Sequence, residues 1–324
     1  MRLPRLAALA TVLSTFLAAD AAFASCGAQN CVLDLRGPEE SAARYSFDLA
    51  YQFVDQDQVR IGTRKGTVGE VAADHNEIET RTESWLMTGR ARFGSVLMLT
   101  ASAPYIDRLH RHEDTESGTP EEESWNFTGL GDLTLLGTYT PGGSEPEGGT
   151  QFSLQLGFKA PIGKRDVDAN EAGEQPEPSA RPSTGSWDGL GGVQLRRWFS
   201  TRTLGGEHMM MPFTIGVLGR VNGKGTDDFQ AGNEVQINAT GGWAMTPNLS
   251  LLGQVNSRFR VKDSEAGEEE ENSGGQAVYV SPGLRAAFGH LAAFGYVQMR
   301  VYERVNGIQI TAPMHVMIGT SYGL

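Results

Sequence analysis

Basic side chains recur at alternate positions in the strand-like stretches of this 324-residue chain. Arg90 and Arg92 stand two residues apart, so both project to one face of an extended strand. A guanidinium group stays charged at any ordinary pH and binds carboxylate or phosphate groups through paired hydrogen bonds. With a few acids in the same phase, the side chains predicted to line one common interior are Asp48, Arg90, Arg92, Asp132, Lys159, Arg196, Arg220, Arg258, Arg260, Arg285 and Arg300.

These charges allow two interpretations. In the first, the basic groups make an interior that favours anions. In the second, they pair with Asp48, Glu83, Asp132 and Glu234, which we expect on the same face, and so only neutralise buried charge. A small barrel has an interior that side chains can largely fill. The sequence leaves both interpretations open.

The strands that position these groups show a period of two. In the stretch 45–53 every odd position is Tyr, Phe or Leu, and the even positions carry Ser, Asp, Ala and Gln. One face of such a strand suits lipid and the other suits water. Strands of this kind are predicted over residues 43–54, 80–93, 96–109, 129–139, 152–160, 187–199, 210–221, 234–245, 249–261, 277–288, 291–304 and 313–324.

The connections between these strands alternate in length. Connections from odd to even strands are long and mostly polar, and those from even to odd strands are short. Beyond the first 24 residues, no run approaches the ~18 to 20 apolar residues that a membrane-spanning helix needs. The predicted fold class is therefore all-β: a single-chain antiparallel transmembrane β-barrel of about 12 strands, with both termini in the periplasm.

The N-terminus predicts a secretory leader. Two arginines precede an apolar run from Leu6 to Leu17, and the small residues Ala22 and Ala24 indicate a cleavage site. Together with the predicted barrel, export of this kind indicates the bacterial cell outer membrane. The expected domains are a signal peptide at 1–24, a periplasmic segment at 25–42 and an outer-membrane barrel at 43–324.

Cys26 and Cys31 are predicted to form a disulfide, because a close cysteine pair in an exported protein normally oxidises. Lipidation of Cys26 is one alternative. A metal site is another, although two thiols do not complete a tetrahedral zinc site. The segment from Cys26 to Ser41 is also a candidate plug for the periplasmic mouth, with a short disordered leader as the alternative.

Other groups give weaker predictions. His208 precedes three methionines, but side chains alternate along a strand, so they do not all reach one copper ion. His110 and His112 share a face near a strand end, where we expect them to be solvated. The Gly-x-Ser-x-Gly sequence at 319–323 lies inside a predicted strand rather than at a strand-to-helix turn, and no Ser, His and carboxylate converge on one outward face. The chain is predicted not to be an enzyme and to bind neither a metal nor a cofactor.

Acidic residues gather in the predicted loops. The formal net charge is −12, and the segments 113–123 and 268–271 are rich in Glu. Such loops are expected to be solvated, with divalent-cation binding at the lipopolysaccharide surface as the alternative. No nucleic-acid partner is predicted. The expected partners are outer-membrane lipid, lipopolysaccharide, the barrel-assembly machinery and a small-molecule solute.

Several short motifs resemble a known family. The segments GLGDL at 129–133, LGFKAPIGK at 156–164 and GSWD at 185–188 are similar to those of outer-membrane transporters grouped as the MetA-pathway of phenol degradation family. The opening DLAYQ at 48–52, DQVR at 57–60 and VYERVNGIQ at 301–309 also resemble it. The chain departs from outer-membrane barrels in ending at Leu324 rather than Phe, although Tyr322 fits.

The resemblance implies an outer-membrane channel or transporter for passive passage of small organic solutes. Because the predicted interior is basic, we expect those solutes to be anionic or aromatic. Two alternatives stay open: a non-conducting barrel that has a structural or partner-docking role, and an outer-membrane hydrolase.

Overall fold

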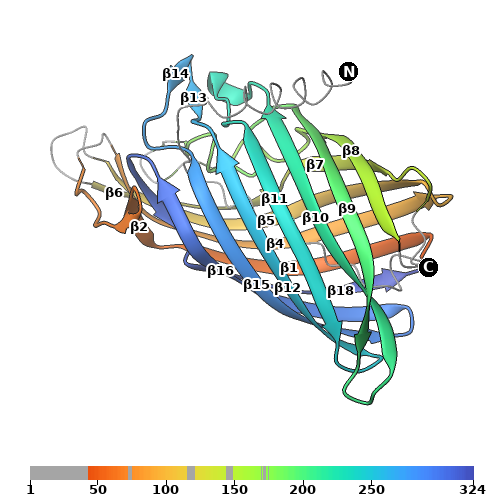
Figure 1. Cartoon of the computed structure of the whole chain (residues 1–324). Coiled ribbons are helices and arrows are strands. Elements are labelled where there is room, and N and C mark those ends of the chain that lie inside the picture. Colours follow the sequence, from red (N-terminus) through yellow and green to blue (C-terminus); the bar gives the residue numbers. More distant parts are fainter. Residues whose placement is uncertain are drawn as a thin grey trace, which may run out of the picture.

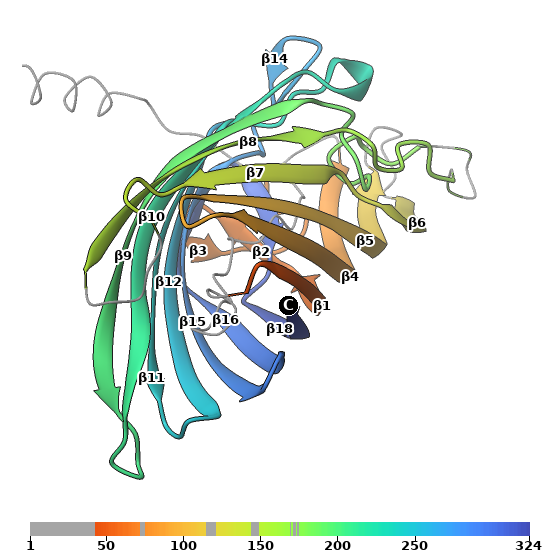
Figure 2. The same ribbon diagram turned by 90° about the vertical axis from the view of Figure 1, so that its right-hand side faces the viewer.

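The alternating stretches form the wall of a closed barrel, described by a computed structural model over residues 43–71, 75–114, 121–143, 149–168, 170, 173 and 175–324 (Figures 1 and 2). Within these residues the only helical element is the 3₁₀ turn η1 (Thr226–Asp228), and no helix is long and apolar enough to cross a membrane. The barrel strands are β1 (Tyr45–Gln56), β4 (His75–Phe93), β5 (Leu97–Asp114), β6 (Glu121–Leu130) with β7 (Leu133–Tyr139), β8 (Thr150–Ala160), β9 (Asp188–Arg202), β10 (His208–Asn222), β11 (Glu234–Ala244), β12 (Leu249–Arg260), β15 (Gly275–Phe288), β16 (Leu291–Val305) and β18 (Met314–Gly323).

The barrel closes between its first and last strands. β1 pairs antiparallel with β18 on one edge and with β4 on the other, so that Leu49 lies opposite Thr320 and Met87. β6 and β7 act as one interrupted wall strand, since both pair with β5 and β7 goes on to pair with β8. The prediction of a 12-strand antiparallel barrel is confirmed.

The two ends of the barrel differ as the connection lengths predict. Short turns such as the one between β15 and β16 lie at one end, where the amide of Gly323 also donates to the His290 carbonyl. Both ends of the barrel sheet, Tyr45 and Gly323, therefore lie at this short-turn end. The long loops gather at the other end, around β6, β13 and β14 in Figure 1.

Side chains of the wall separate by position. In β1, Asp48, Ala50 and Gln52 are buried inside, whereas Phe47 and Leu49 are exposed outside. Similar apolar side chains cover the outside of the other strands, and Leu156 of β8 is 77% exposed. A solvated exterior does not tolerate such a continuous apolar band, whereas a lipid-facing one requires it.

The outward position of Leu156 makes a direct test. Leu156→Arg is expected to lower the free energy of unfolding from phospholipid vesicles by about 2 to 4 kcal/mol, because it places a charge in the hydrocarbon. Urea titration of the refolded barrel measures the change. The control is Gln155→Arg at the neighbouring inward position, which should cost much less. Equal losses from both variants would contradict the assignment of this face to lipid.

The two ends of the acidic segment 113–123, which was predicted as a loop, belong to strands. β5 continues to Asp114 and β6 begins at Glu121, with the two strands paired in register. Opposite charges explain the extension, because Arg111 forms an ion pair with Glu122 at 2.7 Å and His112 lies 3.1 Å from Glu123. Cross-strand pairs of opposite charge stabilise a ladder that apolar alternation alone does not mark.

Small sheets extend the wall at the long-loop end. β17 (Ile308–Thr311), β2 (Gln58–Ile61) and β3 (Arg64–Lys65) form a three-stranded sheet, and β13 (Ser264–Glu265) pairs with β14 (Glu268–Glu269). Arg300 of β16 ties the first of these sheets to the barrel. Its guanidinium contacts Glu303 at 2.7 Å and also the side chain of Gln58.

Candidate functional site

The barrel encloses an inner cavity of about 390 Å³. β1, β4, β5 and β7 to β11 supply most of its wall, because their inward positions carry small, polar or apolar side chains that leave space. Charged groups that line it include Arg90, Asp132 and Lys159. Its apolar surface comes from Ala50, Leu86, Pro104, Ile106, Leu136, Pro182, Leu190, Leu218 and Met317.

Side chains fill the other side of the interior. Asn256 of β12 donates to Asn238 at 2.5 Å and accepts a hydrogen bond from Gln298 at 3.2 Å. Gln298 also lies 3.0 Å from Nδ1 of His315, and all of these groups except Asn238 are buried. This chain of hydrogen bonds links side chains of β11, β12, β16 and β18. Among the described residues, none of those that line the inner cavity belongs to β12, β15 or β16.

A buried lysine organises the rim of the inner cavity towards the long loops. Lys159 Nζ lies 2.8 Å from Asp132 and 3.1 Å from Asp188. It also donates to the hydroxyls of Thr184 at 3.1 Å and Ser186 at 3.2 Å. One cation thus serves two carboxylates whose side chains are each less than a tenth exposed. The free energy of such a cluster depends on keeping all of its members.

The carboxylates of this cluster bind backbone in turn. Asp132 accepts the amide of Gly163 at 3.2 Å, and Asp188 accepts that of Gly223 at 3.3 Å. A Cβ added to Gly163 would lie 2.7 Å from the Leu130 carbonyl oxygen, so only glycine fits at this contact. The cluster therefore brings together the three motifs at 129–133, 156–164 and 185–188.

The segment 175–187 folds inward across the barrel mouth. Arg108 of β5 donates to the Ala180 carbonyl at 2.5 Å, and Arg181 forms an ion pair with Asp227 at 3.1 Å. Ala180 and Ser183 are each only 1% exposed. We call residues 175–184 of this segment the crossing segment, because Ser179 lines both the inner cavity and a second cavity above it.

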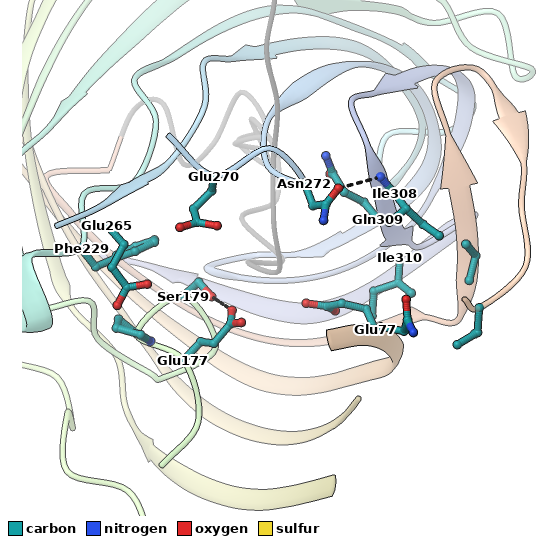
Figure 3. A pocket seen from close by; sticks show the side chains of 14 residues that line it. Glu77, Glu177, Ser179, Phe229, Glu265, Glu270, Asn272, Ile308, Gln309 and Ile310 are labelled. Carbon is teal, nitrogen blue, oxygen red and sulfur yellow. Dashed lines mark hydrogen bonds between the residues drawn. The ribbon is translucent and has the colours of Figure 1, made fainter. Parts of the chain in front are cut away.

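That outer cavity, of about 220 Å³, is acidic. Figure 3 shows Glu177, Glu265 and Glu270 on one side of it and Asn272 and Gln309 on the other. Burial raises the pKa of the Glu265 carboxyl, and the nearby negative charge of Glu177 adds to the rise. No group of three or more His, Cys, Asp or Glu in the described part of the chain is arranged to hold a metal ion.

Most of the charges predicted for the interior have acidic partners in the structure. Arg90 pairs with Asp48 at 2.6 Å, and Arg258 pairs with Glu234 at 2.5 Å. Arg220 lines the inner cavity 4.0 Å from Asp188. The remaining members of the predicted set lie as follows: Arg260 pairs with Asp263, Arg300 pairs with Glu303, Arg285 is buried, and Arg92 and Arg196 line a cavity near the short turns.

Glu83 was expected inside, and that prediction is wrong. It lies two residues before Trp85 in β4 and so shares the outward face, where it accepts a hydrogen bond from the Tyr51 hydroxyl at 2.8 Å. Sequence reasoning also missed Arg108 and Arg181. Arg108 shares the phase of its inward neighbours, which could have revealed it, whereas Arg181 lies in an irregular segment without a period.

The histidines and methionines that were considered as metal ligands pack against other side chains. His110 and His112 are buried rather than solvated, because β5 runs past them, and both rings pack on Trp125 at 5.7 and 4.8 Å between centroids. Met211 is buried in an apolar cluster with Leu252. The predicted signal peptide, the segment 25–42 and the Cys26 and Cys31 disulfide lie outside the described residues.

Comparison with known proteins places this geometry in a family. The family model "Putative MetA-pathway of phenol degradation" matches residues 77–309, which include every strand that contributes to the lysine cluster. The chain belongs to the MetA-pathway of phenol degradation family. No curated protein sequence matches the chain.

Solved structures share the fold of this family member. An outer membrane channel from Pseudomonas putida F1 superposes with a TM-score of 0.59 at 11% identity, over 92% of this chain and 99% of that one. The transport unit of the autotransporter AIDA-I from Escherichia coli gives 0.51 at 9% identity, over 91% and 94%. The fold of this MetA-pathway family member is thus that of bacterial outer-membrane barrels.

Proposed function

We propose that this barrel is an outer-membrane channel that carries small organic solutes passively through its interior. The observation that carries the proposal is the inner cavity of about 390 Å³, which combines an apolar surface with charged groups of both signs. Its volume is in the range of cavities that hold small organic molecules, roughly 300 to 1,000 Å³. The outer membrane channel from Pseudomonas putida F1, which has the same fold, supports the assignment to transport.

The proposal also orients the barrel. Short turns face the periplasm and long loops face the exterior in barrels of this class. A solute would then pass the acidic outer cavity, the crossing segment and the inner cavity before leaving near the short turns. Export through a cleaved signal peptide belongs to the same proposal, as does the absence of enzymatic activity.

A bulky side chain in the inner cavity tests the route. Ser102 lines the cavity from β5, so Ser102→Trp is expected to reduce single-channel conductance in a planar bilayer by about half or more. The matched control is Ala101→Trp, the neighbouring outward position, which should leave conductance unchanged. A silent wild-type barrel that is correctly folded would favour a non-conducting role, and equal conductance in both variants would place the route elsewhere.

A further inference from the structure

The charged groups that line the inner cavity are paired with one another or with neighbours behind the wall. Arg90 pairs with Asp48 at 2.6 Å, and Lys159 pairs with Asp132 at 2.8 Å. The other ion pairs of the lining are Arg181 with Asp227 at 3.1 Å, Arg220 with Asp188 at 4.0 Å and Glu234 with Arg258 at 2.5 Å. An ion that enters the cavity must therefore compete with a partner that each charge already has.

Arg108 is the other charged residue of the lining, and it holds the crossing segment. Its guanidinium donates to the Ala180 carbonyl at 2.5 Å and to the Thr82 hydroxyl at 3.0 Å. The residue is only 5% exposed. Its hydrogen bonds thus serve the protein itself rather than a solute.

Apolar side chains form two bands on opposite sides of the inner cavity. Ala50 lies opposite Leu86 in the ladder of β1 and β4, and Leu86 lies opposite Pro104 in that of β4 and β5, so the three make one continuous band. Leu218 faces them from β10, which lies opposite β1 in the ring of strands. A Cβ added to Gly192 would lie 3.0 Å from Cδ1 of Leu218. Glycine at 192 therefore lets this leucine lie against the wall and leaves the space between the bands open.

A row of hydroxyls runs beside the first band. Thr88, Ser102 and Thr134 all line the inner cavity, and the ladders place Ser102 opposite Thr88 on β4 and opposite Thr134 on β7. A hydroxyl can donate or accept a hydrogen bond. The row can thus bind a neutral polar group of either kind without supplying a charge.

We propose that the inner cavity is a binding site for uncharged solutes that have an apolar body and one neutral polar group, and that it binds ions of the same shape more weakly. This proposal rests on the proposed channel function and names its substrate class. The body would lie between Leu86 and Leu218, with its polar group at the hydroxyl row. An ion there loses its hydration shell and finds the surrounding charges already paired. Of the two interpretations that the sequence leaves open, this is the one in which the interior charges neutralise each other.

Three probes of nearly the same shape separate charge from size. At neutral pH, 4-fluorobenzamide is uncharged, 4-fluorobenzoate is an anion and 4-fluorobenzamidinium is a cation. Each is added to the full mature barrel refolded in a neutral detergent, and its ¹⁹F line width reports the bound fraction. The benzamide is expected to bind at least about tenfold more tightly than either ion, because a charge is costly to move out of water without a partner.

Two variants locate the bound probe. Ser102→Trp fills the inner cavity and should abolish binding of the benzamide, whereas Ala101→Trp on the outward face should leave it unchanged. Probe that dissolves in the detergent is common to both samples and is subtracted. Heat-modifiable gel mobility verifies that each variant is folded.

Unpairing one charge should create affinity for an anion. Asp48→Asn removes the carboxylate that neutralises Arg90 but keeps an acceptor for the Ser321 hydroxyl, which donates to Asp48 at 2.6 Å. The dissociation constant of 4-fluorobenzoate should then fall at least about tenfold, because charge-assisted hydrogen bonds are strong. Asp57→Asn, at an exposed position outside the described lining of the cavity, is the matched control and should leave the affinity unchanged.

Three results would overturn the proposal: an ion that binds the wild type as tightly as the benzamide, benzamide binding that survives Ser102→Trp, or benzoate binding that Asp48→Asn does not strengthen. Recordings in phosphatidylcholine bilayers separate this proposal from the channel function. Ion current that the benzamide blocks more strongly than the benzoate supports both. Current without cavity-dependent benzamide binding overturns the uncharged-solute site alone. Cavity-dependent binding without current overturns the channel function alone.

Discussion

Lys159→Met is expected to lower the free energy of unfolding by about 3 to 5 kcal/mol, the typical cost of leaving a buried charge without its partner. Two carboxylates depend on this cation, Asp132 at 2.8 Å and Asp188 at 3.1 Å, and their side chains are 7% and 2% exposed. Methionine keeps the length of the side chain but supplies neither charge nor donors. The change should appear in urea unfolding of the refolded barrel, followed by tryptophan fluorescence.

Loss of the lysine should also release the chain that follows β8. Thr184 and Ser186 both accept hydrogen bonds from Lys159, so their segment loses its attachment to the wall. Proteinase K, a protease of broad specificity, should then cut the crossing segment much faster than in the wild type. Lys164→Met is the matched control, because Lys164 is exposed and its amino group donates to the Thr128 carbonyl at 3.3 Å.

A rescue distinguishes lost charge balance from lost packing. Adding Asp132→Asn and Asp188→Asn to Lys159→Met removes both unpaired charges and keeps the amide oxygens as acceptors. Part of the lost stability should return. If Lys159→Met is as stable as Lys164→Met, the cluster does not fasten the segment to the wall, and the convergence of the three motifs needs another explanation.

The sequence predicted the wall of the barrel well because lipid and lumen impose a period of two on every strand. β11 begins at Glu234 and β15 ends at Phe288, as expected from the sequence. The prediction from the sequence failed where charged residues, rather than alternating apolar ones, stabilise a strand. In β6, Glu121 to Glu123 look like a solvated loop, but their strand is stabilised by cross-strand basic partners that the local pattern does not reveal.

The candidate site was only half predictable for a related reason. Asp132 and Lys159 could be expected in the interior, and they meet there. Asp188 was visible as part of a motif, but its pairing with Lys159 depends on where a 27-residue connection between β8 and β9 returns to the wall. No period governs such a connection. Its path is set by single contacts, such as the Arg108 hydrogen bond to the Ala180 carbonyl.

Replacing residues 176–182 by seven Gly and Ser residues should raise single-channel conductance about twofold or more, since conductance is limited by the narrowest part of a pore. The crossing segment separates the cavity of about 220 Å³ from that of about 390 Å³, and Ser179 lines both. The replacement removes the Arg181 ion pair with Asp227 and the buried ring of Pro176. A flexible Gly and Ser chain would leave the mouth for much of the time.

The control for this replacement is a change at the same end that leaves the crossing segment intact. Residues 265–268 form the tip of the β13 and β14 hairpin, and of these Glu265 lines only the outer cavity. Gly and Ser at these positions should alter the charge of the outer cavity but leave conductance in concentrated salt nearly unchanged, because salt screens that charge. Unchanged conductance in the 176–182 variant would show that ions pass the segment without hindrance. The constriction would then lie deeper, near the ion pair of Arg90 with Asp48.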